Sequence, residues 1–198
     1  AVFFLARILG ALYFINNINE DDLVKRCRRA LWGNTALFLV FFLAFVIRTL
    51  LADGYAVRPE TGEVFMEPYK YLTNFLQMPV VLLVFLVGVV AVLWGIIRTL
   101  WKPAFDKGIW FAGAGTVLTV LALLLVAGYN NTAYYPSTHD LQSSLTLANS
   151  CSSQFTLKVM AYVSILVPFV LAYIFYAWRS IDNRKIDAKE MEEGGHAY

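Results

Sequence analysis

Side chains that could do acid–base or metal chemistry are scarce in the apolar segments of this chain. The central parts of its long apolar runs contain no Asp, Glu, His or Lys. Such groups are costly inside a membrane, and where they occur they usually mark proton relays, ion sites or cofactors. Their absence argues against a self-contained proton pump, and against a haem or metal site within these runs.

The remaining candidates lie near the ends of the runs or outside them. His139 falls in a polar loop and His196 in the C-terminal tail, so neither has the depth expected of an axial haem ligand. Cys27 and Cys151 are predicted on opposite faces of a membrane, where they cannot form a disulfide with each other. Arg48 lies about one turn from the end of its run, where snorkelling to the headgroups is the favoured role. We therefore assign no catalytic, cofactor-binding or metal-binding residue.

Four apolar runs are long enough to cross a bilayer as helices. A helix rises about 1.5 Å per residue, and the hydrocarbon layer is roughly 30 Å thick. Hydrophobic residues make up 59% of the chain and charged residues 15%, against about 25% charged in ordinary soluble domains. The sequence predicts an all-α fold, a polytopic transmembrane helix bundle that forms a single domain over 1–198. Its complete spans are expected at about 31–51, 76–97, 109–129 and 157–178.

The first apolar segment, 1–15, is too short for a full crossing as a helix. We interpret it as the inner part of a truncated span that begins upstream. A signal peptide is the competing interpretation, but no small-residue cleavage pattern follows the segment. The predicted connections are inner loops 16–30 and 98–108, outer loops 52–75 and 130–156, and a tail at 179–198.

The basic residues predict how the chain is oriented. Four of the sixteen lie in 16–30, three in 98–108 and four in the tail. Positive residues are retained on the cytoplasmic side of short loops. These three regions alternate with the outer loops along the chain, so they share one side. The C-terminus is therefore predicted to be cytoplasmic.

Signals for helix packing are clearer than signals for catalysis. Gly113 and Gly115, set among alanines, predict a thin helix surface that lets a neighbouring backbone approach closely. Pro168 lies in the middle of the last span and lacks an N–H, so the carbonyl of Ser164 should lose its helical partner. A kink is therefore expected, which either lines a cavity or fits a bundle. We favour the fit within a bundle.

Several stretches of the C-terminal part resemble subunit II of the cytochrome bd quinol oxidase family. They are Tyr134 to Ser137, Ser143 to Thr146, and Cys151 to Met160, followed by a helix with Val167-Pro168 and Tyr173. The similarity continues more loosely upstream through Asp53 to Tyr55, Met78-Pro79 and the basic loop at Lys25 to Arg29. The positions that we predict to matter structurally are Pro136, Thr146, Pro168, Gly113 and Gly115.

The resemblance implies the C-terminal half of an eight-span subunit that pairs with cytochrome bd subunit I. In that family the complex oxidises quinol and reduces dioxygen to water, and subunit I holds haems b558, b595 and d. Subunit II would support assembly and proton access, and the acidic residues implicated there belong to an N-terminal half that this sequence does not contain. This chain is thus expected to bind no haem directly.

The resemblance also implies a location and further partners. The location is the bacterial cytoplasmic (inner) membrane, with the chain as a multi-pass protein in contact with membrane lipid. A small accessory subunit is a further partner that the resemblance leaves open, and no nucleic acid is expected.

A helical subunit of a membrane transporter or channel is the alternative. Pro168 and the glycine surface could border a substrate cavity. A cavity for a polar substrate needs convergent polar side chains at mid-depth, and the spans offer little beyond Thr116, Thr119 and Ser164. This scarcity favours the oxidase subunit.

Overall fold

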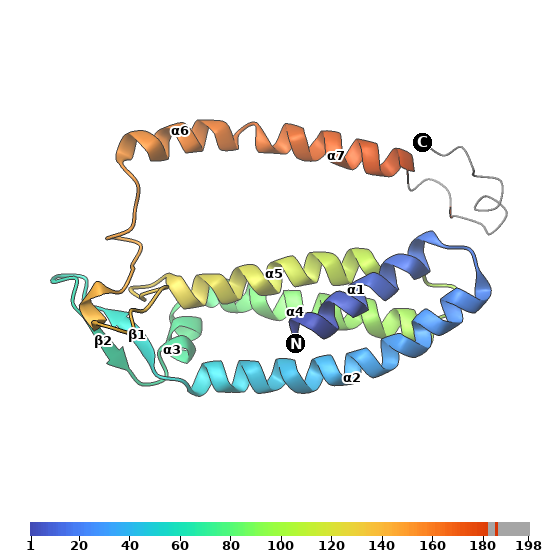
Figure 1. Ribbon diagram of the computed structural model, residues 1–198, viewed down its shortest axis with the longest axis horizontal. Helices are drawn as coiled ribbons and strands as arrows, with labels where there is room; N and C mark the ends of the chain where they lie inside the picture. The colour runs from blue at the N-terminus through green and yellow to red at the C-terminus, as the bar shows by residue number, and fades with distance from the viewer. Residues whose placement is uncertain (182–184, 186–198) are drawn as a thin grey trace.

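The computed structural model of the protein describes residues 1–181 and 185. Within these residues, four helices are long and apolar enough to cross a membrane, and a shorter apolar helix precedes them (Figure 1). This confirms the predicted all-α transmembrane fold with four complete spans and a shorter first segment.

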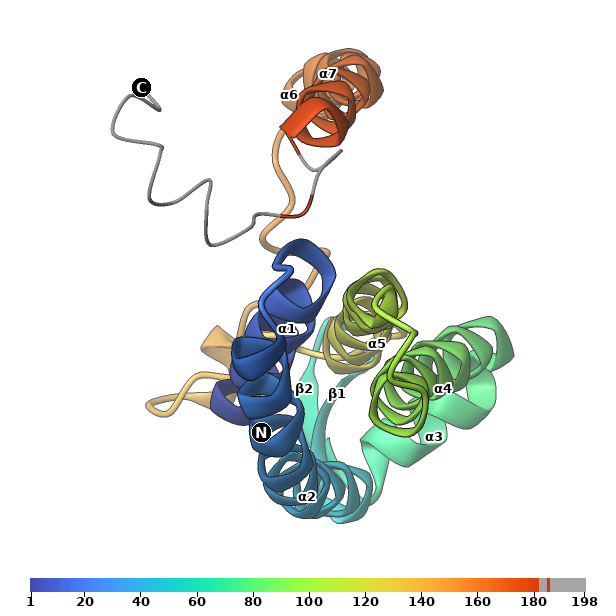
Figure 2. The same cartoon turned by 90° about the vertical axis from the view of Figure 1, so that its right-hand side faces the viewer.

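Most elements follow one another with short connections, and a longer segment joins α5 to α6. The chain begins with α1 (Val2–Asn17) and α2 (Asp21–Leu51), and continues through β1 (Gly54–Val57), β2 (Val64–Glu67), α3 (Lys70–Gln77), α4 (Pro79–Trp101) and α5 (Gly108–Gly128). A 3-10 turn, η1 (Leu141–Ser143), precedes α6 (Gln154–Ser164) and α7 (Val167–Ile181). Helices α1, α2, α4 and α5 lie side by side as a bundle (Figures 1 and 2).

The helix α2 begins earlier than the predicted span at 31–51. It starts at Asp21, so the basic residues Lys25 to Arg29 lie on its first turns rather than in a loop. Asp21 and Asp22 occupy the first turn, where carboxylates interact favourably with the helix dipole. Its 31 residues make a helix about 46 Å long, which exceeds a hydrocarbon layer of roughly 30 Å. The basic turns therefore extend beyond the apolar part of the span.

The predicted span at 76–97 is divided by a proline. Met78 has φ −116° and ψ 72°, outside the helical region, because a proline ring crowds the residue that precedes it. Pro79 then opens α4 at a position where a missing N–H costs nothing. Consequently α3 is a separate short helix at the end of the bundle that carries β1 and β2 (Figure 1). We call this the hairpin end, and the opposite end, with Lys25 to Arg29 and the α4–α5 turn, the basic end.

The segments predicted as loops 52–75 and 130–156 contain regular structure at the hairpin end. Strands β1 and β2 pair antiparallel, with Gly54 opposite Glu67 and Val57 opposite Val64. Residues 131–133 add to the free edge of β1, through hydrogen bonds of 2.8 Å from the Val57 N–H to Asn131 O and of 2.9 Å from the Ala133 N–H to Tyr55 O. The two loops thus fold on each other as one cap over the bundle.

The bundle has two hydrophobic cores. One joins α1, α2, α4 and α5 around Ile8, Leu12, Leu31 and Ile96, all of which are fully buried. The other lies toward the hairpin end and joins α3, α4 and α5 around Phe75, Phe85, Ala122 and Val126.

Helices α6 and α7 stand apart from this bundle, as Figures 1 and 2 both show. None of their described residues is buried. The helical pattern is interrupted at Ile165 and Leu166, just before Pro168, and their N–H groups bond three residues back to Tyr162 O and Val163 O. A proline at 168 predicts such an interruption, because it cannot donate to the carbonyl of Ser164.

Candidate functional site: helix packing and membrane-facing surfaces

The bundle's closest backbone approach is between α4 and α5. A Cβ atom added to Gly115 would lie 2.5 Å from Gly88 O, and one added to Gly95 would lie 2.7 Å from Gly108 O. Both distances are far below van der Waals contact, so no larger residue fits without moving a helix. We call Gly88, Gly95, Gly108 and Gly115 the glycine seam. Small residues of this kind let membrane helices pack backbone to backbone.

Of the two glycines in the predicted surface, Gly115 lies against α4 within this chain and Gly113 does not. A Cβ atom added to Gly113 would meet nothing within 4 Å, so this residue is outside the seam. Residues two apart point to different sides of a helix, whereas residues three or four apart share a face. The buried face of α5 follows that spacing through Gly108, Ala112, Gly115 and Thr119.

The hydroxyl groups along these helices bond within their own helix. Thr99 Oγ1 donates to Gly95 O at 2.8 Å, Thr116 Oγ1 to Ala112 O at 2.7 Å and Thr119 Oγ1 to Gly115 O at 2.8 Å. Ser164 Oγ donates likewise to Ala161 O at 2.7 Å on α6. Thr116 and Thr119 line one apolar cavity of about 430 Å³, but their hydroxyl groups donate within their own helix, and Ser164 lies apart on α6.

Arg28 ties α2 to the α4–α5 turn at the basic end. Its guanidinium donates to Thr99 O near the end of α4, to Pro103 O at 2.8 Å and to Phe105 O at 3.4 Å. These carbonyls include groups that a helix end leaves without partners, and a cation suits the negative end of the helix dipole. Sequence reasoning treated Arg28 as one of several solvated basic residues, since nothing in the run of four basic residues distinguishes the half-buried one that makes these contacts.

A second ionic contact reaches the same turn from beyond α7. Lys185 Nζ lies 2.6 Å from Asp106 Oδ2, and both side chains are partly exposed. Residues 179–181 of the predicted tail form the end of α7, and the rest of it apart from Lys185, including His196, lies outside the described residues.

A buried amide organises the hairpin end. Asn74 is fully buried, and its Nδ2 donates to Val126 O and to Thr132 Oγ1, both at 2.9 Å. Its Oδ1 accepts from Asn130 Nδ2 at 3.1 Å, and Asn130 also donates to Gln77 Oε1 at 2.6 Å. This network links α3 to the end of α5 and to the loop that follows it.

Two buried or half-buried titratable side chains lie at the cap, Lys70 and Tyr71. Lys70 is 6% exposed, and its Nζ lies 3.0 Å from Glu67 Oε2. Burial, with a smaller contribution from Tyr55, raises the pKa of Tyr71 above its ordinary value. The neutral phenol is therefore the form that the fold favours.

Two of the other predicted residues flank one bridge in the cap. Tyr135 and Leu145 form an isolated antiparallel bridge, so Pro136 and Thr146, which each follow one of these residues, lie on opposite sides of it. Thr146 is 6% exposed, and its N–H donates to Asn149 Oδ1 at 2.8 Å. Pro168 lies away from this cap, on the separate helices α6 and α7.

Side chains suited to metals do not cluster in the part of the chain that the structure describes. It holds no group of three or more His, Cys, Asp or Glu that could bind a metal ion. His139 is exposed in the cap, and Cys27 and Cys151 are free thiols, the first partly buried and the second exposed. Among the described residues His139 is the only histidine, and it lies in the cap rather than in a long apolar helix.

Taken together, the four long apolar helices, the glycine seam and the polar cap define a multi-pass helical membrane protein. The sequence profile of the family described as cytochrome bd terminal oxidase subunit II matches residues 1–181. The chain therefore belongs to this family, which confirms the resemblance noted in its sequence.

Curated relatives agree with this assignment. The chain is 30% identical over 155 residues to cytochrome bd-I ubiquinol oxidase subunit 2 of Escherichia coli strain K12. The proteins of the same name from E. coli O6:H1 and E. coli O157:H7 match equally. The match covers 77% of this chain and 39% of the relative, so the aligned region spans about two fifths of the relative's length.

Proposed function

We propose that this chain acts in a quinol:O2 oxidoreductase, a terminal respiratory oxidase, as part of its non-haem-ligating subunit II. Family membership supports this role, because the relatives are named as subunits of a ubiquinol oxidase. Subunit I is then the partner that binds haems b558, b595 and d, and quinol and dioxygen are substrates of the complex.

The observation that carries the proposal is the unpacked surface of α6 and α7. These helices are apolar, yet none of their described residues is buried against α1 to α5. Exposed large side chains run along both helices, among them Phe155, Tyr162, Phe169, Tyr173 and Tyr176. A subunit of a multi-chain membrane complex needs such surfaces for the helices of its partner. We infer that α6 and α7 contribute to assembly with subunit I.

The packed part of the bundle has a different role in this proposal. The glycine seam brings two backbones into contact, and the nearby threonine hydroxyls are bonded to their own helices. A chain of waters needs accessible polar groups, and the threonines of the seam are buried with their hydroxyl protons donated within their own helices. We infer that α4 and α5 act as a barrier beside the proton route of the oxidase, which keeps water from reaching the reaction by other paths.

The proposed setting is the cytoplasmic membrane of a bacterium. The basic end is the cytoplasmic side, since it carries the basic residues of α2 and of the α4–α5 turn. The C-terminus and Lys185 then lie on that side, and the cap faces outward. Membrane lipid surrounds the helices, and a small accessory subunit is compatible with the remaining surface.

The experiment is to co-express the reading frame that contains this chain with the subunit I gene of its source, in a host without its own quinol oxidases. We expect the purified assembly to show haem bands in a reduced-minus-oxidised visible spectrum and quinol-dependent oxygen uptake. An assembly that forms without haem bands and without oxygen uptake would contradict the proposal.

A matched pair of variants tests the contribution of this chain. Gly115→Leu places a large side chain between α4 and α5 and forces them apart at the seam. Gly113→Leu places the same side chain in open space on the same helix. Gly115→Leu should lower the yield of haem-containing complex severalfold, and Gly113→Leu should leave it unchanged. Equal yields from the two variants would show that the seam is irrelevant to assembly.

A further inference from the structure

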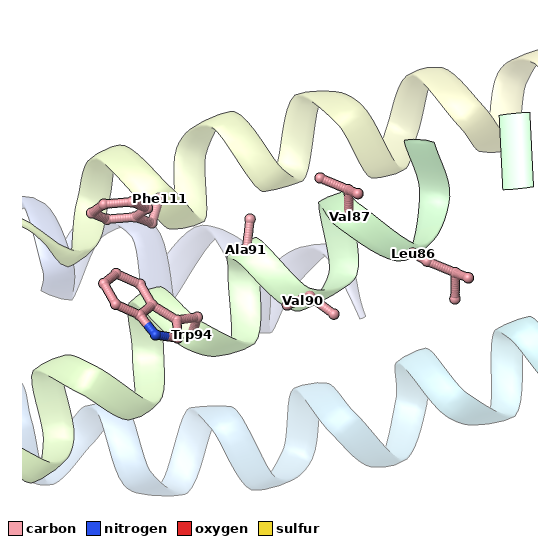
Figure 3. Close-up of a pocket in the computed structure, with 6 residues that line it drawn as sticks. All are labelled: Leu86, Val87, Val90, Ala91, Trp94 and Phe111. Carbon is pink, nitrogen blue, oxygen red and sulfur yellow. The ribbon is translucent and has the colours of Figure 1, made fainter. Parts of the chain in front are cut away.

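An apolar groove runs along the membrane-facing side of α4. It has a volume of about 390 Å³ and is lined by Leu86, Val87, Val90, Ala91 and Trp94 of α4 and by Phe111 of α5 (Figure 3). The larger aliphatic side chains are about half exposed or more, with Val90 at 62%. From Leu86 to Trp94 the helix rises about 12 Å, close to the depth of the acyl chains in one leaflet of a 30 Å hydrocarbon layer.

Aromatic rings close the groove toward the basic end. The ring centroids of Trp94 and Phe111 are 4.5 Å apart in an edge-to-face arrangement, and Phe105 lies 5.8 Å from Trp94. Figure 3 shows Trp94 and Phe111 side by side where the two helices meet. Tryptophan at this depth is typical of the boundary between acyl chains and headgroups.

A cation lies immediately beyond the rings. The Arg98 guanidinium carbon is 6.0 Å from the Trp94 ring centroid and 5.9 Å from that of Phe105. The Arg98 Nε is buried and has no hydrogen-bond partner among the described residues. Lys102 follows directly after the last residue of α4 and is exposed. The nearest acidic residue of this turn, Asp106, already pairs with Lys185.

We propose that this groove and Arg98 form a binding site for an anionic phospholipid. One acyl chain lies along the groove from Trp94 to Leu86, and the phosphate group accepts hydrogen bonds from Arg98, with Lys102 beside it. A planar guanidinium suits two phosphate oxygens, and its attachment above aromatic rings fixes it at headgroup level. The charge of the site favours an anionic headgroup over a zwitterionic one. This site does not depend on the proposed oxidase role.

The test is photolabelling with phosphatidylglycerol that carries a diazirine in its acyl chain. The purified protein, with the subunits that accompany it, is placed in phosphatidylcholine nanodiscs with a small fraction of this probe, and labelled peptides are identified by mass spectrometry. We expect label on the α4 peptide that contains Leu86 to Trp94. Excess unlabelled phosphatidylglycerol should compete, and a phosphatidylcholine probe should label this peptide several times less.

Three variants separate the site from general attraction to basic residues. Arg98→Gln should lower α4 labelling at least threefold, Arg98→Lys should retain most of it, and Arg26→Gln, at the same end on α2, should leave it unchanged. Circular dichroism checks that each variant is folded. A further variant, Val90→Trp, fills the groove and should abolish labelling. It is compared with Arg98→Lys, which keeps both the charge and the groove.

Three results would overturn the proposal. The first is equal loss of label in Arg98→Gln and Arg26→Gln, which indicates diffuse attraction. The second is equal labelling by the two lipid probes. The third is an unlabelled α4 in a complex whose other helices are labelled, which indicates that a protein covers the groove.

Discussion

Helices α5, α6 and α7 are all apolar, yet α5 packs against other helices of the chain and α6 and α7 do not. In the most apolar window of α5, 28% of residues are buried inside the protein, and in the window that covers α6 and α7 none is. The mean hydropathy of the two windows is similar, at 2.3 and 2.1. Hydropathy therefore places both in a membrane but does not say which helix packs within its own chain.

The spacing of small residues accounts for the difference. On α5 they recur at Gly108, Ala112, Gly115, Thr119 and Ala122, which keeps them on one face of the helix. Lipid is as apolar as leucine, so helices associate in a membrane through close packing rather than through loss of water contact. Large side chains surround α7, so the backbone of a neighbouring helix cannot approach the α7 backbone closely.

The largest effect is expected from a bulkier residue at Gly115, because it disrupts the packed face that distinguishes α5 from α6 and α7. Gly115→Leu should lower the free energy of unfolding by about 3 kcal/mol, because its side chain must displace the α4 backbone at Gly88. Denaturation in mixed micelles, followed by circular dichroism, measures the change.

Gly113→Leu is the matched control for this prediction. Its Cβ atom meets nothing within 4 Å, so unfolding should change little or become slightly harder. Similar destabilisation by the two substitutions would mean that helix propensity, not the seam, governs α5.

Removing the Asn74 amide should have the next largest effect. Asn74→Ala leaves Val126 O and the Asn130 amide without their partner in a buried place, at a cost of about 2 kcal/mol. Thermal unfolding of the purified protein measures it. Asn149→Ala, in the part-buried loop of the cap, should cost less, and the reverse order would contradict the assignment of Asn74 as the centre of the network.

Arg28→Gln tests the tie at the basic end. Loss of the charged hydrogen bonds to Thr99 O and Pro103 O should cost about 1.5 kcal/mol, and Arg29→Gln on the exposed side of the same turn should cost under about 0.5 kcal/mol. The readout is again thermal unfolding. Equal shifts for Arg28→Gln and Arg29→Gln would show that net charge matters and the carbonyl contacts do not.

Much of the fold follows from hydropathy, and the parts that do not have physical reasons. The apolar runs predict the long helices because a bilayer leaves the backbone few other ways to bond. The β1–β2 hairpin escaped prediction because four-residue strands are too short for a clear alternation, and their pairing with residues 131–133 joins distant parts of the chain. The start of α2 at Asp21 was not predicted, because we took the charged residues to mark the end of the helix. A helix can continue through charged residues once it has left the apolar layer of the membrane.

The individual residues of the surfaces were harder to predict. Composition alone groups Gly113 with Gly115, whereas spacing around the helix separates them, with Gly115 against α4 and Gly113 away from it. Arg28 differs from its basic neighbours through contacts with residues more than seventy positions away, which no local pattern indicates. Arg98 is similar, since the rings beside it come from both α4 and the following turn.

The smallest expected effect concerns Pro168. Because α6 and α7 are not packed against the bundle, Pro168→Ala should change the unfolding of α1 to α5 by less than about 0.5 kcal/mol. Its effect should be local, since alanine restores a donor for Ser164 O and lets the interruption at Ile165 and Leu166 close. Spin labels at the exposed positions Lys158 and Ser180 report this, because a continuous helix would hold them about 33 Å apart. The distance distribution should narrow and shift toward that value. An unchanged distribution would mean that the interruption is held by contacts with other helices of the assembly, and that α6 and α7 differ from α5 in what covers them rather than in how they fold.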